Sequence, residues 1–163
     1  MGAGCPGLTG AIAEASAQAY SREFMLGDVA TAESAAYVYA DTHTAIHWFG
    51  QLTSRRAMAC LVRTLREAVG FETAAQGATL DSIAQRRLNI EPVGDEHSAH
   101  LLIVRVSAGA AKATAYADVI YVRVGRAVAA FSLGQVDRIF DTALENKLAT
   151  AVAGRLASGQ RGS

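Results

Sequence analysis

Residues 114–133 read TAYADVIYVRVGRAVAAFSL, and this stretch decides the fold. Two runs rich in β-branched and aromatic residues flank the single Gly125, which is the pattern of a β-hairpin. Within the first run, successive side chains alternate between the two faces of the strand. One face carries Tyr116, Asp118, Ile120 and Val122, and the other carries Ala117, Val119, Tyr121 and Arg123. The hairpin predicts an antiparallel sheet.

The flanking sequence predicts further strands and two helices. Residues 35–41, 78–89 and 99–106 are each expected to contain a strand, and residues 45–50 either extend the first strand or form a connection. Residues 107–113 are small and read as a loop. Apolar residues recur at helical spacing over 53–70, where Gly70 is expected to end the helix, and again over 137–156.

These elements predict an α+β fold. Consecutive strands with short connections pair antiparallel, and two amphipathic helices can cover one face of such a sheet. We therefore expect an antiparallel β-sheet of about five strands with both helices on one face, as a two-layer sandwich. Residues 33–158 form the single domain. Residues 1–32 are expected to be flexible or weakly helical, and residues 159–163 a disordered tail.

Composition excludes several classes of protein. The 163 residues are 51% hydrophobic and 18% charged, with a formal net charge of +0. That apolar content argues against a disordered chain, and the absence of a basic surplus argues against a general nucleic-acid binder. No stretch approaches the ~18 apolar residues of a membrane-spanning helix. The first residues lack the charged start and long apolar segment of a signal peptide.

The two cysteines, Cys5 and Cys60, leave three alternatives open. Ala3-Gly4-Cys5 has the small-small-Cys arrangement that precedes lipid attachment in bacterial lipoproteins. Alternatively, Cys5 is an incidental residue of a glycine-rich leader. As a third alternative, Cys5 forms a disulfide with Cys60, which would stabilise the fold by about 2–4 kcal/mol and require an oxidising compartment.

No catalytic residue, metal site or cofactor is predicted. His43 and His47 are four residues apart, but their segment reads as strand-like and lacks the glutamate of a zinc-binding helix. A second polar cluster combines His97 and His100 with Asp95 and Glu96, and it is interpreted as a solvated loop before a buried strand. Nucleophile-elbow and phosphate-loop motifs are absent from the sequence. Arg55, Arg56, Arg63 and Arg66 are expected to lie on the solvated side of the first helix.

Four segments, in this order, resemble a known group of proteins. They are the helix at 54–61 (SRRAMACL), the loop at 93–96 (VGDE), the hairpin at 118–128 (DVIYVRVGRAV) and the closing helix at 144–156. Together they are similar to actinobacterial secreted lipoproteins related to the extracellular sensor domains of receptor serine/threonine kinases. The resemblance covers roughly residues 53–156. It implies an α+β domain outside the cytoplasmic membrane that binds a small ligand or an envelope component.

The functional expectation is therefore a non-enzymatic, extracytoplasmic binding domain, secreted or held to the membrane through a lipid anchor. Its partner would be an unknown small molecule or envelope component, bound in a cleft between the open sheet face and the N-terminal segment. Aromatic residues with a polar tip suit an amphipathic ligand. The candidates are Tyr37, Tyr39, Trp48, Tyr116 and Tyr121. The alternatives are a homodimerising structural module and a small hydrolase or metal-dependent enzyme built on the cluster at 95–100.

Overall fold

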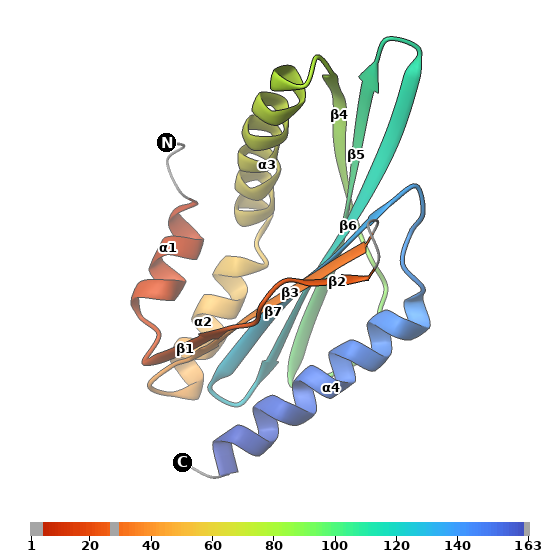
Figure 1. Ribbon diagram of the computed structural model, residues 1–163. Coiled ribbons are helices and arrows are strands. Elements are labelled where there is room, and N and C mark those ends of the chain that lie inside the picture. The colour runs from red at the N-terminus through yellow and green to blue at the C-terminus, as the bar shows by residue number, and fades with distance from the viewer. Residues whose placement is uncertain (1–4, 27–29, 162–163) are drawn as a thin grey trace.

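The computed structural model describes residues 5–26 and 30–161, which form helices packed on an antiparallel sheet (Figure 1). The predicted α+β class is confirmed. The elements in chain order are α1 (Pro6–Ala13), β1 (Ala17–Tyr20), β2 (Phe24–Leu26), β3 (Ala30–Val38), α2 (Thr42–Leu52), α3 (Arg55–Ala75), β4 (Thr79–Arg87), β5 (Glu96–Ala108), β6 (Ala111–Val124), β7 (Ala127–Val136) and α4 (Thr142–Arg161).

The hairpin quoted at the outset lies at the centre of the sheet as β6 and β7, which pair from Ala115↔Val136 to Val124↔Ala127. Gly125, in the turn of this hairpin, has a φ of 53°, a conformation that residues other than glycine disfavour. The strand order is β1-β3-β7-β6-β5-β4, and β2 also pairs with β3, which gives seven strands. β1 and β2 follow one another along the outer edge of β3.

Helices lie on both faces of this sheet, whereas the sequence analysis expected them on one. Tyr121 and Val128 belong to a core cluster with residues of α1, α2 and α3. Ile120 and Phe131 belong to a separate cluster with Ala149 of α4. Because the central strands are apolar on both sides, each side requires its own cover. The result is a layer of α1–α3, the sheet, and α4 on the opposite side (Figure 1).

The described part of the segment 1–32 forms one helix, two strands and the start of a third, rather than the flexible or weakly helical segment that was expected. Ala11 of α1 is fully buried, and the ring of Trp48 lies so close to Gly10 that an added Cβ would come within 2.9 Å of it. β1 and β2 are held by pairing with β3. This long-range packing outweighs the low apolar content of the segment. The expectations for residues 1–4 and 27–29 lie outside the described residues.

Three other boundaries differ from the expectations. Residues 42–52 form the helix α2, capped by Asp41, whose Oδ1 accepts a hydrogen bond from the Thr44 amide at 2.7 Å. α3 continues through Gly70 to Ala75, because its last turns pack against β4. β5 and β6 extend through most of 107–113 to a tight turn at Gly109.

The chain end is also more ordered than expected. α4 reaches Arg161, and the Gln160 side chain donates to the Val124 carbonyl at 2.7 Å. The same side chain accepts from the Arg126 amide at 3.1 Å, so it ties the helix end to the β6–β7 turn. Residues 162–163 lie outside the described residues.

Candidate functional site

The structure brings four of the five predicted aromatic residues together, but in the core. Tyr37, Tyr39 and Tyr121 are 4%, 0% and 8% exposed, and Trp48 packs against them. Tyr116 lies elsewhere, because it pairs with Gln135 on the α4 face of β6. Helix α2, which the sequence analysis did not predict, covers the sheet face that was expected to be open. The aromatic cleft is therefore filled by the protein itself.

Burial keeps the hydroxyls of this aromatic cluster protonated. Desolvation, aided by the negative charge of Glu14, raises the pKa of Tyr39 to about 12. Desolvation also raises the pKa of Tyr121. These groups are packing elements and take no part in acid–base chemistry near neutral pH.

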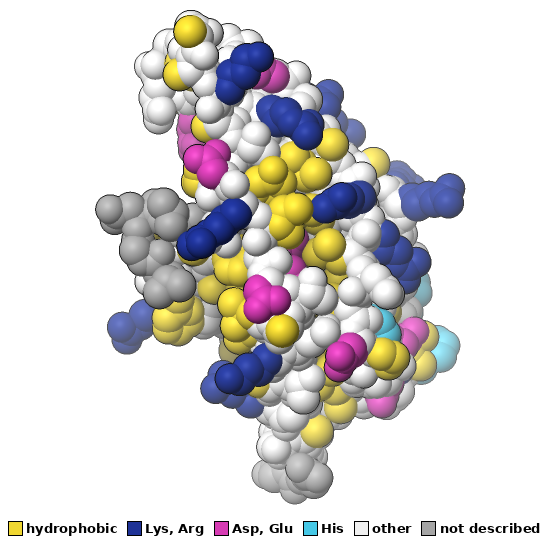
Figure 2. All heavy atoms as spheres, turned by 90° about the vertical axis from the view of Figure 1, so that its right-hand side faces the viewer, with side chains coloured by type: hydrophobic (Ala, Val, Ile, Leu, Met, Phe, Trp, Pro, Cys, Tyr) yellow, Lys and Arg dark blue, Asp and Glu magenta, His cyan; other side chains and the backbone are white. Residues whose placement is uncertain are grey.

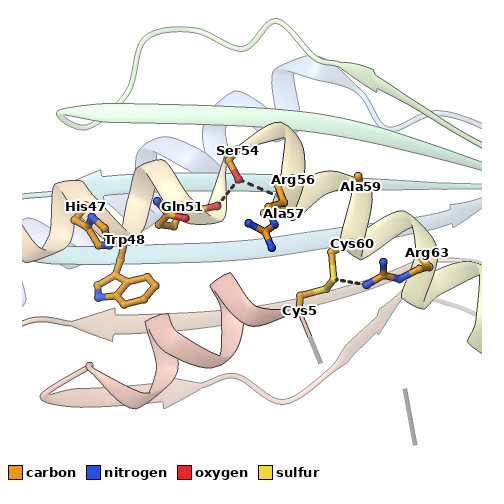
Figure 3. Close-up of a pocket in the computed structure, with 10 residues that line it drawn as sticks. All are labelled: Cys5, His47, Trp48, Gln51, Ser54, Arg56, Ala57, Ala59, Cys60 and Arg63. Atoms are coloured by element: carbon orange, nitrogen blue, oxygen red, sulfur yellow. Dashed lines mark hydrogen bonds between the residues drawn. A yellow bond between two sulfur atoms is a disulfide. The ribbon is translucent and has the colours of Figure 1, made fainter. Parts of the chain in front are cut away.

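An outer pocket of about 630 Å³ lies beside the junction of α2 and α3 (Figure 3). Trp48 is the one predicted aromatic residue that lines it, and its indole Nε1 donates to Glu14 at 3.1 Å. Its lining residues are Cys5, His47, Trp48, Gln51, Ser54, Arg56, Ala57, Ala59, Cys60 and Arg63.

Cys5 and Cys60 form a disulfide at the rim of the outer pocket. Their Cα atoms are 5.7 Å apart, within the usual range for such a bond, and the residues are 55 positions apart in sequence. Arg63 points its guanidinium group at the bond and contacts the Cys60 Sγ at 3.4 Å (Figure 3). Of the three alternatives for Cys5, the structure contains the disulfide, which fastens α1 to α3.

An inner pocket of about 700 Å³ lies on the same side of the sheet, between the α2–α3 junction and strands β4 and β5. Buried Phe49 and Met58 supply its apolar wall. Strand residues supply its floor. The lining residues are Phe49, Thr53, Arg55, Met58, Ala59, Gln85, Arg87, His97, Ser98 and His100.

The predicted polar cluster at 95–100 is divided by the structure. Asp95 accepts from Arg123 at 2.9 Å, and Glu96 forms a second ion pair with the same guanidinium group. The side chain of Arg123 is only 7% exposed, so the two carboxylates neutralise a buried charge. Asp95 also accepts from the Gly125 amide at 2.7 Å. The two acids therefore have a structural role, and only the histidines of the cluster line the inner pocket.

His100 is the centre of a short chain of hydrogen bonds in the pocket floor. The Gln85 Nε2 lies 2.8 Å from the His100 Nδ1, and the His100 Nε2 lies 3.1 Å from the Ser98 Oγ. An amide nitrogen only donates, so Nδ1 accepts and the imidazole proton resides on Nε2. Desolvation, together with the positive charge of Arg87, lowers the pKa of His100. The ring is thus neutral and donates to the serine.

This direction is the reverse of the one that nucleophilic catalysis needs. In a serine hydrolase the histidine accepts the hydroxyl proton, whereas here its Nε2 already carries one. The Ser98 oxygen is the acceptor. The His100 ring is therefore not placed to accept the Ser98 proton, which disfavours the hydrolase alternative.

Positive charge surrounds this floor. Arg87 pairs with His100 across the β4–β5 ladder and projects from the same face, while Arg55 begins α3 above it. Among the described residues that line the inner pocket, none is an aspartate or glutamate. The pocket offers mainly hydrogen-bond donors.

Sequence reasoning missed the grouping of Gln85, Ser98 and His100. Its signal lay in the period-2 spacing of 85 and 87 and of 98 and 100, which puts each pair on one face of its strand. The two pairs meet because the β4–β5 register places Arg87 opposite His100. That register is visible only in the folded structure.

His43 and His47 lie on helix α2, so the expectation of a strand-like segment was wrong. Both side chains are exposed, and their helical spacing puts them on one side of α2. Across residues 5–26 and 30–161, no cluster of three His, Cys, Asp or Glu residues could hold a metal ion. None of the helices in that part of the chain is long and apolar enough to cross a membrane.

Comparison with known proteins gives little further guidance. No protein-family model and no curated protein matches this chain. One solved structure, that of PA94, a protein of unknown function from Pseudomonas aeruginosa, is similar at 16% identity and a TM-score of 0.23. The match covers 73% of this chain and 68% of that one.

Proposed function

We propose that this protein is an extracytoplasmic, non-enzymatic binding domain that takes a small molecule into the inner pocket. The observation that carries this proposal is the combination of a hollow of about 700 Å³, an apolar wall and a polar floor that includes the buried Ser98 and His100. Small-molecule sites combine these features, because apolar walls supply affinity and a few fixed polar groups supply orientation. Ser98 and His100 are 7% and 8% exposed, so their positions are fixed before a ligand arrives.

The disulfide supports the extracytoplasmic part of the proposal. Disulfides persist in oxidising compartments and are reduced in most cytosols. The likeness of residues 53–156 to secreted lipoproteins agrees with this location. The Cys5 sulfur cannot carry a lipid while it is bonded to Cys60. Under this proposal the protein is therefore secreted, or held at the membrane by something other than a lipid on Cys5.

The binding part is tested by NMR with a fragment library and two matched variants. Ala59 is exposed on α3 and lines the inner pocket, whereas Ala68 is exposed on the same helix away from it. Fragments are expected to shift the amide signals of Gln85, Ser98 and His100. Ala59→Trp should abolish these shifts, and Ala68→Trp should preserve them. Fragment shifts that survive Ala59→Trp, or a library that never perturbs the three residues, would contradict the proposal.

The location is tested separately in cells that express the natural gene. Acid-quenched cells are treated with a thiol-reactive polymer before and after reduction, and the protein is followed by its change in mobility. We expect both cysteines to be blocked before reduction. Two free thiols in growing cells would contradict the extracytoplasmic assignment without affecting the pocket.

A further inference from the structure

We infer that the inner pocket binds the oxyanion end of its ligand, a carboxylate or phosphate group, through the Ser98 hydroxyl and the flanking arginines. This inference rests on the proposed binding function and specifies the ligand's chemistry. Its starting point is the ordered chain from Gln85 through His100 to Ser98.

The chain sets the direction in which Ser98 donates. The Gln85 amide donates to Nδ1 at 2.8 Å, and Nε2 then donates to the serine oxygen at 3.1 Å. Because the oxygen of Ser98 is already an acceptor, its hydroxyl hydrogen is left to be donated in another direction. Ser98 lines the pocket, so a ligand oxygen there would receive that hydrogen. Hydrogen-bond chains polarise each member in the same sense, which strengthens the final donor.

The charges around the chain favour the same kind of ligand. Arg87 is the cross-strand neighbour of His100, and Arg55 lies at the start of α3. In the part of the chain that the structure describes, the ion pairs involve Arg123, and neither Arg55 nor Arg87 is paired with a carboxylate. Guanidinium groups bind carboxylate and phosphate oxygens with two parallel hydrogen bonds.

The rest of the ligand is apolar. Phe49 and Met58 are 6% and 3% exposed and form the wall opposite the strand residues. A chain or ring carried by the oxyanion would contact these side chains. The inferred class is therefore a small organic acid or phosphate ester with an apolar body.

The inference is tested with four probes of one chain length: hexanoate, hexyl phosphate, hexanamide and hexylamine. Binding is followed by the amide signals of Ser98 and His100 and by calorimetry. The two anions should bind at least about tenfold more tightly than the amide, as expected for one charge-assisted hydrogen bond. Which anion binds better identifies the headgroup. Equal binding of hexanamide and hexanoate would overturn the inference.

Two variants test the mechanism. Arg87→Gln should weaken anion binding about tenfold, whereas Arg66→Gln, on an exposed part of α3 outside the pocket, should leave it unchanged. Gln85→Glu places an acceptor beside Nδ1, so the imidazole proton should move from Nε2 to Nδ1 and the Ser98 hydroxyl should turn toward the ring. Gln76→Glu, exposed at the end of α3, controls for the added charge.

The imidazole nitrogen shifts of His100 give a readout that does not depend on binding. The wild type should show a protonated Nε2 and an unprotonated Nδ1, and Gln85→Glu should reverse them. A wild-type ring protonated on Nδ1 would overturn the proposed direction of donation. If hexylamine or hexanamide perturbs the pocket residues as strongly as the anions, the inference fails while the binding function stands. If no fragment and none of the four probes perturbs them, both fail.

Discussion

The two faces of the sheet are held by different physical means. On one face, α1, α2 and α3 cover an aromatic core of Tyr37, Tyr39 and Tyr121, and the Cys5–Cys60 bond fastens the outermost helix. On the other face, α4 alone covers a core that is aliphatic except for the aromatic ring of Phe131 and that of Phe140 at its margin. Both pockets lie on the first face. The first face therefore combines the covalent cross-link with both of these pockets.

The α4 face contains an unusual buried pair of acids. Asp118 of β6 and Glu145 of α4 are 0% and 1% exposed, and no donor among the described residues reaches their carboxyl oxygens. Burial is the main cause that raises the pKa of Glu145 to about 7, and the adjacent carboxyl group of Asp118 is the second cause. Burial also raises the pKa of Asp118, with Arg86 acting in the opposite direction. A proton shared between the two carboxyls lets one donate to the other, as in other close acid pairs.

Figure 2 shows the side of the molecule that lies on the right in Figure 1, and there apolar side chains gather among basic ones. Val136, Ile139 and Leu144, around the connection from β7 to α4, keep 42%, 43% and 40% of their surface exposed. The cover that α4 provides is therefore incomplete at its first turn. We therefore expect reduction of the disulfide to destabilise the face covered by α1–α3, and a rise in pH to destabilise the face covered by α4.

The largest expected effect comes from removing the disulfide. The double variant Cys5→Ser/Cys60→Ser should lower the free energy of unfolding by about 2–4 kcal/mol, because the cross-link no longer restricts the unfolded chain. Urea unfolding measures this loss, and hydrogen exchange locates it. Faster exchange is expected in α1, with α4 unchanged. Equal loosening of α4 would break the comparison between the faces.

The next effect is the pH dependence of the α4 face. The folded state keeps a proton on Glu145 up to about pH 7, whereas the unfolded chain releases it near the ordinary glutamate pKa of 4.5. Stability from this group is therefore complete below pH 4.5 and is lost as pH rises through about 7, by up to about 3 kcal/mol. Urea unfolding between pH 5 and pH 8 measures the slope. Glu145→Gln should remove this slope, and a slope that persists in the variant would assign it to other groups.

A smaller effect is expected at the C-terminal end of α4. Gln160→Ala removes the hydrogen bonds to the Val124 carbonyl and the Arg126 amide. The loss should be about 1 kcal/mol, with faster exchange in the last turn of α4. Thr150→Ala, at an exposed position of the same helix, is the matched control. Faster hydrogen exchange throughout α4 would show that the Asp118–Glu145 pair does not hold the rest of the helix in place once the Gln160 hydrogen bonds are lost.

The smallest effect tests the aromatic face. The hydroxyl of Tyr39 is buried, and the described residues offer it no partner. Tyr39→Phe removes this unsatisfied group, so stability should stay constant or rise by less than about 1 kcal/mol. Tyr121→Phe serves as a comparison within the same cluster. A clear loss of stability in Tyr39→Phe would mean that the hydroxyl is satisfied by bound water.

Much of the fold could be predicted from local sequence. The hairpin around Gly125 and the periodic helix over 53–70 depend on residues close in the chain, and both are present. The two-faced apolar pattern of 116–123 also indicated that both faces need cover. This alternation can be read from the sequence alone, so helices on both faces of the sheet could have been predicted.

Other features depend on partners far away in sequence. Ala45, Phe49 and Leu52 of α2 have helical spacing, but the β-branched Thr42, Thr44 and Ile46 in the first half of the segment favour strands. The N-terminal segment has low apolar content and gains its order from pairing with β3. The floor of the inner pocket depends on the β4–β5 register, which a shift of one residue would turn to the other face.

The divided outer strand has a consequence for association. β1 and β2 have four and three residues, so the free edge beside β3 is short and interrupted. At the opposite edge, β4 carries an irregularity between Leu80 and Ser82 and ends in Arg86 and Arg87. Short, bulged and charged edges resist pairing with another sheet. Each molecule thus limits the growth of its own sheet, and copies of this chain are not expected to associate by extending it.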